Sequence, residues 1–425
     1  MTPCRHRFAT DARTLTPYVV GMRVIDRRPR MLRFILAIGL ALIAAASIAQ
    51  APDPIRVGVT GPFTGGSSPM GLSMREGIRI AADQINAGGG ILGRPIELVE
   101  RDDEARNEKG AQVVQELIEA EGIVAGLGIV NTGVALASQR HYQNARIPVI
   151  TSVATGTLIT RQFVPPEFPD NFVFRVSAND ALQAAMIVFE AIDRGGFKRV
   201  AIFHDATNYG QLGREDLENA LAARGIKAVA TERFQLRQAD MTPLLRRARD
   251  AGAQAILTYG IGPELAQIAN ARARMGWVVP IIGSWTLAMS NFVDDARPNA
   301  EGARMPQTFI AEPTTEKRAA FLEAWRQRTG SIRIPVPPAA AQGYDSMLIL
   351  AAAIEQAGST DGDRIREALE SLEHKIEGAV MTYERPFSRV KRESITRTHD
   401  IFMGEVRNGR IVFAYEGDRQ RATGQ

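Results

Sequence analysis

The sequence has almost no cysteine, few histidines and few aromatic residues. Of 425 residues, one is cysteine, five are histidine and 6% are aromatic. The only cysteine, Cys4, lies in an N-terminal segment that we expect to be removed, so we predict no disulfide, no thiol chemistry and no lipidated cysteine. The remaining histidines, His141, His204, His374 and His399, are scattered along the chain and suggest no metal-ligand cluster.

The commonest catalytic motifs are also absent. The chain has no G-x-S-x-G elbow, no G-x-x-x-x-G-K-[ST] loop and no H-E-x-x-H pair. The loop GPFTGGSS, residues 61–68, contains glycines but lacks the dinucleotide-binding fingerprint. We therefore predict that the protein is not an enzyme, uses no cofactor and has no metal site.

The net charge does not favour nucleic acid as a partner. The whole chain carries +4, but residues 1–49 hold eight arginines and two aspartates, a net +6, which leaves −2 for the rest. No basic cluster with interleaved aromatic residues appears after residue 49. We therefore predict no binding to nucleic acid.

The N-terminal segment has the pattern of an export signal. Met31–Ala49 begins with the basic Arg33, continues with about fifteen apolar residues and ends in the small residues Ser47-Ile48-Ala49. The alternative is a membrane anchor, but a span needs about 20 apolar residues. We predict a cleaved signal peptide and a protein that is free in the periplasm.

The rest of the chain alternates between strand and helix patterns. Setting aside 49 of the 425 residues leaves 376, too many for one ordinary core, so we expect two domains. Strands are predicted at 55–60, 96–100, 122–125, 148–150, 172–175, 199–204, 227–234, 255–259 and 280–282. Helices are predicted at 73–86, 107–119, 132–144, 181–193, 212–223, 242–251, 263–275, 315–328 and 341–357. This alternation is typical of parallel sheets covered by helices, an α/β fold.

The first strand–helix–strand unit, residues 55–104, indicates where a ligand would bind. In open α/β sheets, ligands lie beyond the carboxyl ends of the strands, so the loop 62–68 is a candidate. Asp102 and Asp103 follow the second strand. They could be metal ligands, a pair of acidic groups, or hydrogen-bond acceptors for the loop backbone. No histidine or third carboxylate stands at ligand spacing nearby, so we favour hydrogen bonds to loop backbone.

The same passage resembles the branched-chain amino-acid-binding proteins, the periplasmic receptors of ABC importers. The first strand, the G-x-x-T-G loop at 61–65 and the I-N-x-G-G-x-I-x-G turn at 85–93 follow in the family's order. The resemblance covers essentially the whole chain after the signal. It implies two doubly wound, Rossmann-like lobes joined by a multi-strand hinge, the type I periplasmic binding protein fold.

The resemblance also implies where the chain crosses between lobes. Crossings are expected near Arg175, near Ala303 and close to a C-terminal hairpin at Asn408-Gly409, a pair that independently favours a type I′ turn. The domain division that follows is residues 1–49 for the extension and signal, 50–174 with 303–398 for lobe 1, and 175–302 with 399–425 for lobe 2.

The first lobe supplies three candidate ligand-binding turns. Phe63 and Ser68 lie in the first loop, Asn131 and Thr132 open a helix, and Val153 and Thr155 follow a strand. By resemblance, the Asn131-Thr132 turn holds the carboxylate of the ligand, and the Val153 backbone and Thr155 hydroxyl contact it. The alternatives are a helix cap at Asn131 and loop-backbone hydrogen bonds at Ser152 and Thr155.

The second lobe supplies Tyr209, Ile261 and Trp285. By resemblance Tyr209 closes over the ligand; otherwise it packs on a strand end. Trp285 stands where amino-acid-binding relatives have a carboxylate for the ligand's ammonium, unless it serves only in packing. A buried ammonium without an ionic partner is costly, whereas an indole offers a stacking face and one N–H. We therefore expect an aromatic or apolar carboxylate, or an amide, rather than an ordinary amino acid.

Three other positions are interpreted as structural. His204 follows a buried strand, Glu264 begins a helix, and Tyr344-Asp345 holds a connection between lobes.

We predict a periplasmic substrate-binding protein of an ABC importer that captures a small carboxylate-bearing solute by hinge closure. Its partners would be that solute and a membrane permease, and it would be a monomer. One alternative is a receptor that senses amides or other small solutes and signals to a regulator. The other is a periplasmic hydrolase with an unrecognised site.

Overall fold

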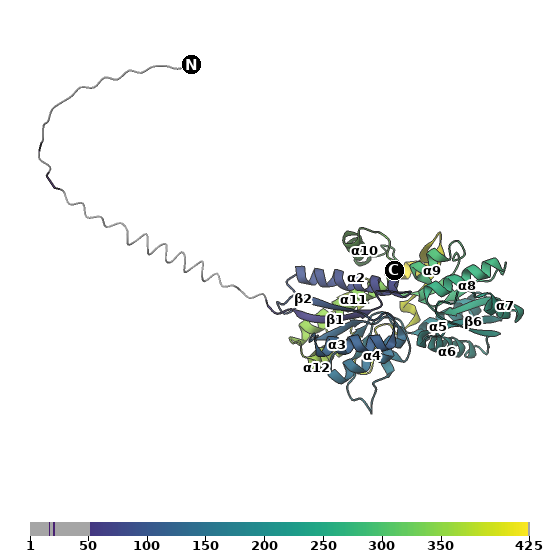
Figure 1. Cartoon of the computed structure of the whole chain (residues 1–425), viewed down its shortest axis with the longest axis horizontal. Helices are drawn as coiled ribbons and strands as arrows, with labels where there is room; N and C mark the ends of the chain where they lie inside the picture. The colour runs from purple at the N-terminus through teal and green to yellow at the C-terminus, as the bar shows by residue number, and fades with distance from the viewer. Residues whose placement is uncertain (1–16, 18–19, 22–51, 424–425) are drawn as a thin grey trace, which may run out of the picture. The chain divides into compact units, whose positions relative to one another are not determined.

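The computed structural model describes residue 17, residues 20–21 and residues 52–423. The chain divides into Met1–Ala51 and a compact unit, Pro52–Gln425, which holds the helices and strands given below (Figure 1). The predicted signal peptide at Met31–Ala49 and Cys4 lie outside the described residues. Among the helices that the structure describes, none is both long enough and apolar enough to cross a membrane.

Five parallel strands form the first sheet, in the order β2-β1-β3-β4-β5. They are β1 (Ile55–Gly61), β2 (Ile96–Asp102), β3 (Ala125–Gly128), β4 (Val149–Thr151) and β5 (Val173–Arg175). Val57 in β1 stands opposite Leu98 on one side and Ala125 on the other. Because the chain winds outward in both directions from β1, loops after β1 and β3 diverge and leave a crevice at the carboxyl edge.

Helices cover both faces of this sheet. In Figure 1, α2 (Ser68–Ala87) and α11 (Pro337–Ala357) lie on one side of β1, and α3 (Asn107–Glu119) and α4 (Thr132–Ala145) on the other. The crossing of α2 and α11 depends on glycine. A Cβ on Gly77 would lie 2.0 Å from the carbonyl oxygen of Ala340, and one on Gly343 would lie 2.3 Å from that of Met74.

The second sheet has seven strands, in the order β14-β13-β10-β9-β8-β6-β7. They are β6 (Val200–Asp205), β7 (Ala230–Phe234), β8 (Ala255–Tyr259), β9 (Ile281–Gly283), β10 (Arg304–Gln307), β13 (Phe402–Arg407) and β14 (Arg410–Phe413). The strands from β7 to β10 are parallel and repeat the order of the first sheet, and β13 and β14 are antiparallel additions. The predicted α/β class with two doubly wound lobes is confirmed.

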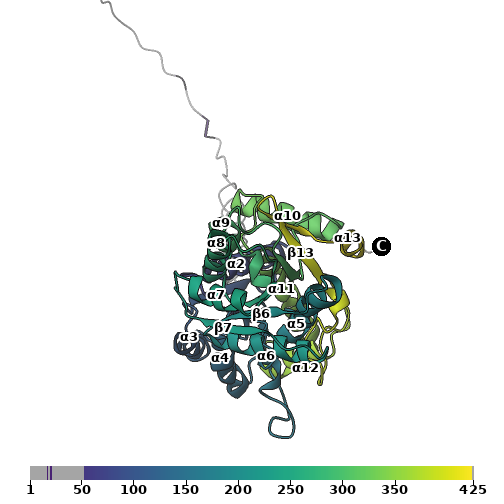
Figure 2. The same cartoon turned by 90° about the vertical axis from the view of Figure 1, so that its right-hand side faces the viewer.

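The helices of the second half surround that sheet, as Figure 2 shows for α5, α6 and α7 near β6 and β7. They are α5 (Asp180–Val188), α6 (Asn208–Ala222), α7 (Thr242–Asp250), α8 (Gly262–Arg274) and α9 (Ser290–Asp295). The other elements are α10 (Glu316–Thr329), α12 (Gly362–Glu370), β11 (Ile376–Glu377), β12 (Thr382–Tyr383), α13 (Glu416–Ala422) and the short helices η1 (Ile159–Arg161), η2 (Phe189–Arg194), η3 (Trp285–Ala288) and η4 (Thr398–Asp400).

Three segments join the two sheets. The first follows β5, the second follows β10, and the third precedes β13. The predicted boundary near Ala303 assigns β10 to the first lobe, but β10 belongs to the seven-stranded sheet because Arg304 pairs with both Ile282 and Glu405. The chain leaves that sheet only after Gln307. The predicted hairpin at Asn408-Gly409 is present, with φ of 54° and 69° as a type I′ turn requires.

Several predicted boundaries are wrong: the helices expected from 212 and 341 begin at Asn208 and Pro337, and the strand expected from 227 begins at Ala230. Two further errors have clear local reasons. The strand expected at 122–125 is β3, Ala125–Gly128, because Gly122 turns the chain at φ 62° before pairing with β1 begins. The helix expected from residue 73 begins at Ser68, since Pro69 fits the first helical turn, where no backbone donor is needed. Because the helix begins at Ser68, Met70 lies in its first turn, next to the carboxyl end of β1.

Candidate functional site

A small cavity lies where the carboxyl ends of the two sheets face each other. Its walls come from the segments after β1, β3, β4, β6, β8 and β9. They are Met70, Val130, Asn131, Thr132, Thr155, Tyr209, Ile261, Trp285 and Thr286. The cavity has a volume of about 10 Å³, roughly that needed by one water molecule, so the two halves are closed over it.

Asn131 and Thr132 form the wall at the start of α4. The Asn131 side chain does not cap the helix; its Nδ2 donates to Ser67 Oγ at 3.2 Å. Thr132 Oγ1 accepts a hydrogen bond from the Gly156 backbone N–H at 3.3 Å, which ties the second turn to the third. Helix capping by its side chain therefore does not explain Asn131.

Three polar atoms in the cavity wall have no hydrogen-bond partner within the described part of the chain. They are Asn131 Oδ1, Tyr209 Oη and Trp285 Nε1. All three atoms are buried; the Tyr209 and Trp285 residues are each 6% exposed, whereas Asn131 as a whole is partly exposed. A buried polar atom without a partner costs about 1–3 kcal/mol, and such atoms in a native protein call for an explanation. A ligand that hydrogen-bonds to them would remove that cost.

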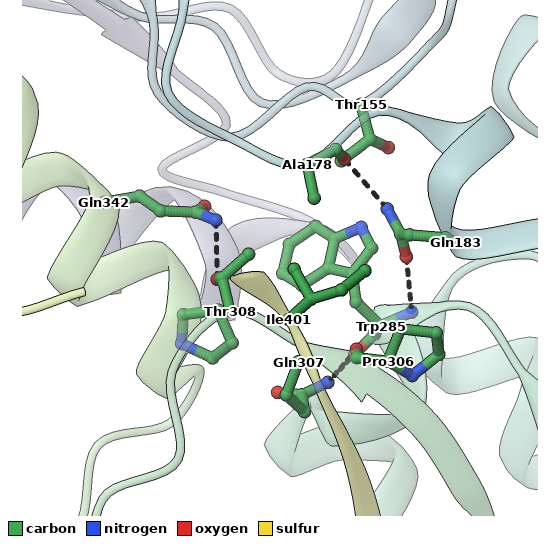
Figure 3. A pocket seen from close by; sticks show the side chains of 10 residues that line it. Thr155, Ala178, Gln183, Trp285, Pro306, Gln307, Thr308, Gln342 and Ile401 are labelled. Carbon is green, nitrogen blue, oxygen red and sulfur yellow. Dashed lines mark hydrogen bonds between the residues drawn. The ribbon is translucent and has the colours of Figure 1, made fainter. Parts of the chain in front are cut away.

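Trp285 is held in place through its backbone by two glutamines. Its N–H donates to Gln183 Oε1 at 3.1 Å, and its carbonyl accepts from Gln307 Nε2 at 3.2 Å (Figure 3). Gln183 belongs to α5 and Gln307 ends β10, so the indole is anchored next to the first and second segments that join the sheets. The indole itself packs in the wall shared by two cavities.

The cavity is polarised without charged side chains. None of the described residues in its wall carries a carboxylate, ammonium, guanidinium or imidazole group. Four of the wall residues lie at helix starts: Met70 in the first turn of α2, Thr132 first in α4, Tyr209 second in α6, and Ile261 just before α8. Helix N-termini present free N–H groups and partial positive charge, which favours an anion.

A carboxyl group lies directly behind this wall. Asp180, the first residue of α5, is fully buried, and its Oδ2 has no partner among the residues described. Burial raises the pKa of Asp180 to about 7, which the Thr155 hydroxyl and Arg175 oppose. Arg175 is itself buried and donates to the carbonyl oxygens of Thr155 and Gly156 at 3.1 and 2.7 Å. These groups fix the third turn of the first sheet from behind.

Six of the nine predicted ligand contacts line the cavity: Asn131, Thr132, Thr155, Tyr209, Ile261 and Trp285. The other three do not. The Phe63 ring packs under Arg75 and its N–H donates to Asp102, Ser68 is the first residue of α2, and Val153 lies in the hydrophobic core.

Sequence reasoning missed Met70, Val130 and Thr286. Met70 was placed in a loop before the helix, so its side chain had no predicted direction. Thr286 adjoins the predicted Trp285, and its hydroxyl donates to the Gly260 carbonyl oxygen at 2.7 Å. The sequence offered one indication that Val130 and Thr286 line the cavity: they are next to the predicted residues Asn131 and Trp285.

The predicted role of Asp102 and Asp103 in holding loop backbone is confirmed. Asp102 Oδ1 accepts from the N–H groups of Phe63 and Glu104 at 2.9 and 2.8 Å, and Asp103 Oδ1 accepts from Ala105 at 2.9 Å. In the part of the chain that the structure describes, no group of three or more histidine, cysteine, aspartate or glutamate side chains is arranged to hold a metal ion.

The other three positions interpreted as structural make protein contacts. Asp345 accepts from the N–H groups of Ala379 and Val380 at 2.6 and 2.9 Å, which holds that segment to α11. Glu264 lies in the first turn of α8, as predicted. His204 is buried in β6, and burial lowers its pKa.

Comparison with known sequences gives a consistent family. Residues 54–410 match the periplasmic binding protein family. The chain is 26% identical over 333 residues to the leucine-, isoleucine-, valine-, threonine- and alanine-binding protein of Pseudomonas aeruginosa, covering 78% of this chain and 86% of that protein.

Solved structures show the same fold. A type 1 periplasmic binding protein from Bordetella pertussis Tohama I superposes with a TM-score of 0.76 and 26% identity, covering 85% of this chain and 99% of that one. A solute-binding protein of an ABC transporter from Rhodopseudomonas palustris HaA2, solved with p-hydroxybenzoic acid, gives a TM-score of 0.73 at 21% identity, covering 85% and 95%. Members of such a family bind solutes and do not catalyse reactions, which agrees with the prediction that the chain is not an enzyme. The chain belongs to the periplasmic binding protein family.

Proposed function

We propose that this protein is the periplasmic substrate-binding component of an ABC importer, and that it captures a small carboxylate-bearing solute between its two lobes. The proposed lobes are residues 50–174 with 303–398, and residues 175–302 with 399–425. The exception is β10, whose strand partners are in the second lobe. The partners would be the solute and a membrane permease, and the predicted signal at Met31–Ala49 would direct the chain to the periplasm. We expect a monomer.

The observation that carries this proposal is the set of buried polar atoms that face the cavity without a protein partner. Asn131 Oδ1 comes from one half, and Tyr209 Oη and Trp285 Nε1 come from the other. A solute that hydrogen-bonds to all three contacts both halves at once. Its binding would therefore favour the closed arrangement over an open one.

A carboxylate is the group that fits the first-lobe side. The starts of α2 and α4 face the cavity, and the Thr132 and Thr155 side chains lie in its wall. Backbone N–H groups at helix starts and hydroxyl donors stabilise a carboxylate without a cationic side chain. Phe63, Ser68 and Val153 would then act only by shaping these turns.

The second-lobe side favours an aromatic or apolar carboxylate, or an amide, over an amino acid. An α-ammonium group would be buried beside Ile261 and Trp285 without a carboxylate in the wall. The relatives include both classes, since the Pseudomonas protein is named for aliphatic amino acids and the Rhodopseudomonas structure holds p-hydroxybenzoic acid. The indole of Trp285 supports the second class for this chain.

Binding requires the lobes to separate and close. A solute of ten or so heavy atoms cannot enter a closed cavity of about 10 Å³. The three joining segments allow a hinge motion, in which a solute binds one lobe first and the other closes over it. The permease would then recognise the closed form.

A thermal-shift screen of refolded protein tests the proposal. The panel contains leucine, isoleucine, valine, benzoate, phenylacetate, benzamide and urea. A ligand at 100 times its Kd stabilises by about 2.7 kcal/mol, which gives a clear rise in Tm. We expect aromatic carboxylates or the amide to raise Tm and the three amino acids to leave it unchanged. A rise with leucine, isoleucine or valine alone would show that Trp285 does not set the ligand class.

A further inference from the structure

A second small cavity lies behind Trp285, at the joint between the lobes. Figure 3 shows the indole surrounded by residues from all three joining regions. The walls are Thr155, Ala178, Gln183, Trp285, Pro306, Gln307, Thr308, Pro338, Gln342 and Ile401. Thr155 and Trp285 belong to both cavities, so the two cavities adjoin on either side of the indole. We call the second one the tail cavity.

The tail cavity is polar but uncharged. Its polar side chains are amides and hydroxyls together with the indole, and none of the described wall residues is acidic or basic. Transfer of a charged group into such a site is expensive, whereas a neutral polar group is tolerated if it is hydrogen-bonded. The chemistry excludes a second carboxylate or an ammonium at that end of a ligand.

Gln307 has an acceptor that the described protein atoms leave unused. Its Nε2 donates to the carbonyl oxygens of Pro306 and Trp285, at 2.8 and 3.2 Å. Both partners are acceptors only, so they fix which end of the amide is nitrogen and which is oxygen. Gln307 Oε1 is buried and has no donor in the described part of the chain.

The two other amides of the tail cavity have protein partners. Gln183 accepts from the Trp285 N–H at 3.1 Å and donates to the Ala178 carbonyl oxygen at 3.1 Å. Gln342 Nε2 donates to Thr308 Oγ1 at 2.8 Å. Among the amides in the described wall of the tail cavity, Gln307 is therefore the one whose oxygen is buried without a donor.

We propose that the tail cavity receives the end of the ligand opposite its carboxylate, and that Gln307 Oε1 accepts a hydrogen bond from a neutral donor there. This inference rests on the proposed function of the first cavity. It narrows the ligand class to carboxylates with a hydroxyl or carboxamide at the far end. Gln307 is then a specificity-determining residue, because a ligand without that donor leaves its oxygen buried and unpaired.

Calorimetric titration with four probes tests the inference. The probes are 4-hydroxybenzoate, 4-fluorobenzoate, benzoate and terephthalate, used with the wild-type protein, Gln307→Met and Gln183→Met. We expect 4-hydroxybenzoate to bind at least about tenfold more tightly than 4-fluorobenzoate, which has similar size but no donor. Terephthalate should bind more weakly than benzoate, because its second carboxylate would be buried in an uncharged cavity.

In Gln307→Met, the advantage of 4-hydroxybenzoate should fall below about threefold. Gln183→Met is the matched control: its amide is used by the protein, so both affinities should change together and the ratio should persist. The comparison of 4-hydroxybenzoate with 4-fluorobenzoate in wild-type protein stands even if Gln307→Met fails to fold.

Two results would overturn the inference and leave the proposed function intact. One is equal affinity for 4-hydroxybenzoate and 4-fluorobenzoate, and the other is an advantage that survives in Gln307→Met. If none of the four probes binds, both the inference and the proposed aromatic carboxylate class fail.

Discussion

At the scale of single residues, the important atoms are those that the fold buries without giving them partners. Asn131 was open to interpretation as a simple helix cap, but its side chain reaches Ser67 and leaves Oδ1 in the cavity wall. Tyr209 and Trp285 bury one polar atom each beside it. Such atoms call for an explanation, and the proposed ligand supplies one for these three.

Tyr209→Phe should weaken ligand binding without weakening the fold. The hydroxyl has no partner among the described residues, so its removal should change the free energy of unfolding by less than about 0.5 kcal/mol. Affinity for the ligand should fall about fivefold, as expected for one lost hydrogen bond. Chemical denaturation and calorimetry measure the two effects.

Tyr259→Phe is the matched control, since the two rings pack 5.3 Å apart and only Tyr259 has a protein partner, the Asp180 carbonyl oxygen at 3.1 Å. It should lose about 1 kcal/mol of stability and keep its affinity. Equal destabilisation by the two substitutions would contradict the interpretation of Tyr209.

Asp180→Asn should change how stability depends on pH. Burial raises the pKa of Asp180 to about 7, whereas an unfolded aspartate titrates near 3.9. Its stabilising contribution is therefore complete below about pH 4 and is lost as pH rises through 7. Asparagine does not titrate, so the variant should gain roughly 1 to 3 kcal/mol relative to wild type between pH 4 and pH 7, then level off.

Urea denaturation at several pH values measures this difference. Asp250→Asn, at an exposed aspartate that ends α7, is the control and should differ from wild type by less than about 0.5 kcal/mol throughout. If the wild-type protein instead gained stability relative to Asp180→Asn as pH rises, the predicted direction of the pKa shift of Asp180 would be wrong.

At the scale of secondary-structure elements, glycines decide how closely helices approach. Gly77 and Gly343 let α2 and α11 cross with backbone against backbone. In β3, Gly126 leaves room for the Tyr142 ring, which a Cβ would meet at 2.5 Å. These glycines lower the helix and strand propensity of the sequence, but they permit close packing that a Cβ would prevent.

Gly77→Ala should destabilise the protein even though alanine favours helix. The new Cβ would lie 2.0 Å from the Ala340 carbonyl oxygen, so the two helices must separate, at a cost of about 2 kcal/mol or more. Gly417→Ala, in α13 with no atom within 4 Å of the added Cβ, should be neutral or stabilise by up to about 1 kcal/mol. Chemical denaturation of both variants measures the effect. The free energy of unfolding should fall by about 2 kcal/mol or more in Gly77→Ala and should stay level or rise in Gly417→Ala.

At the scale of the whole molecule, the site lies where parts distant in sequence meet. Arg175 ends the first sheet, contacts the turn at Thr155 and Gly156, and pairs with Glu393 at 2.5 Å, in the segment that leads to the third crossing. The two cavities lie beside it, between the carboxyl edges of both sheets. We therefore expect the contacts that hold the Thr155 turn to affect both ligand binding and the position of the hinge.

Arg175→Met should be strongly destabilising. It removes a fully buried guanidinium, takes its donor from two carbonyl oxygens and leaves Glu393 without its cationic partner, though Thr160 and Asn179 still donate to that carboxylate. Breaking a buried ion pair in this way typically costs about 3–5 kcal/mol. The control is Arg326→Met, which breaks an ion pair with Glu323 whose side chains are 52% and 48% exposed, and should cost less than about 1 kcal/mol. Similar losses in the two variants would show that Arg175 has no special structural role.

Small-angle X-ray scattering should show that the ligand closes the molecule. The described residues enclose a cavity too small for a solute, so the free protein must open to admit one. We expect the radius of gyration to fall when a ligand that raises Tm is added, because closure brings the lobes together. An unchanged radius of gyration would argue against hinge closure.

The sequence by itself determined the α/β class, the helix at 107–119, the strand at 255–259 and the hairpin turn at Asn408-Gly409, because hydrophobic period and turn chemistry are local properties. Residue patterns together with a family resemblance also predicted six of the residues that line the cavity. Only the tertiary structure decided that β10 joins the second sheet, since strand partners are chosen across the fold. It alone placed Met70 and Gln307 beside the site, because side-chain direction depends on where a helix begins and which strand neighbours which.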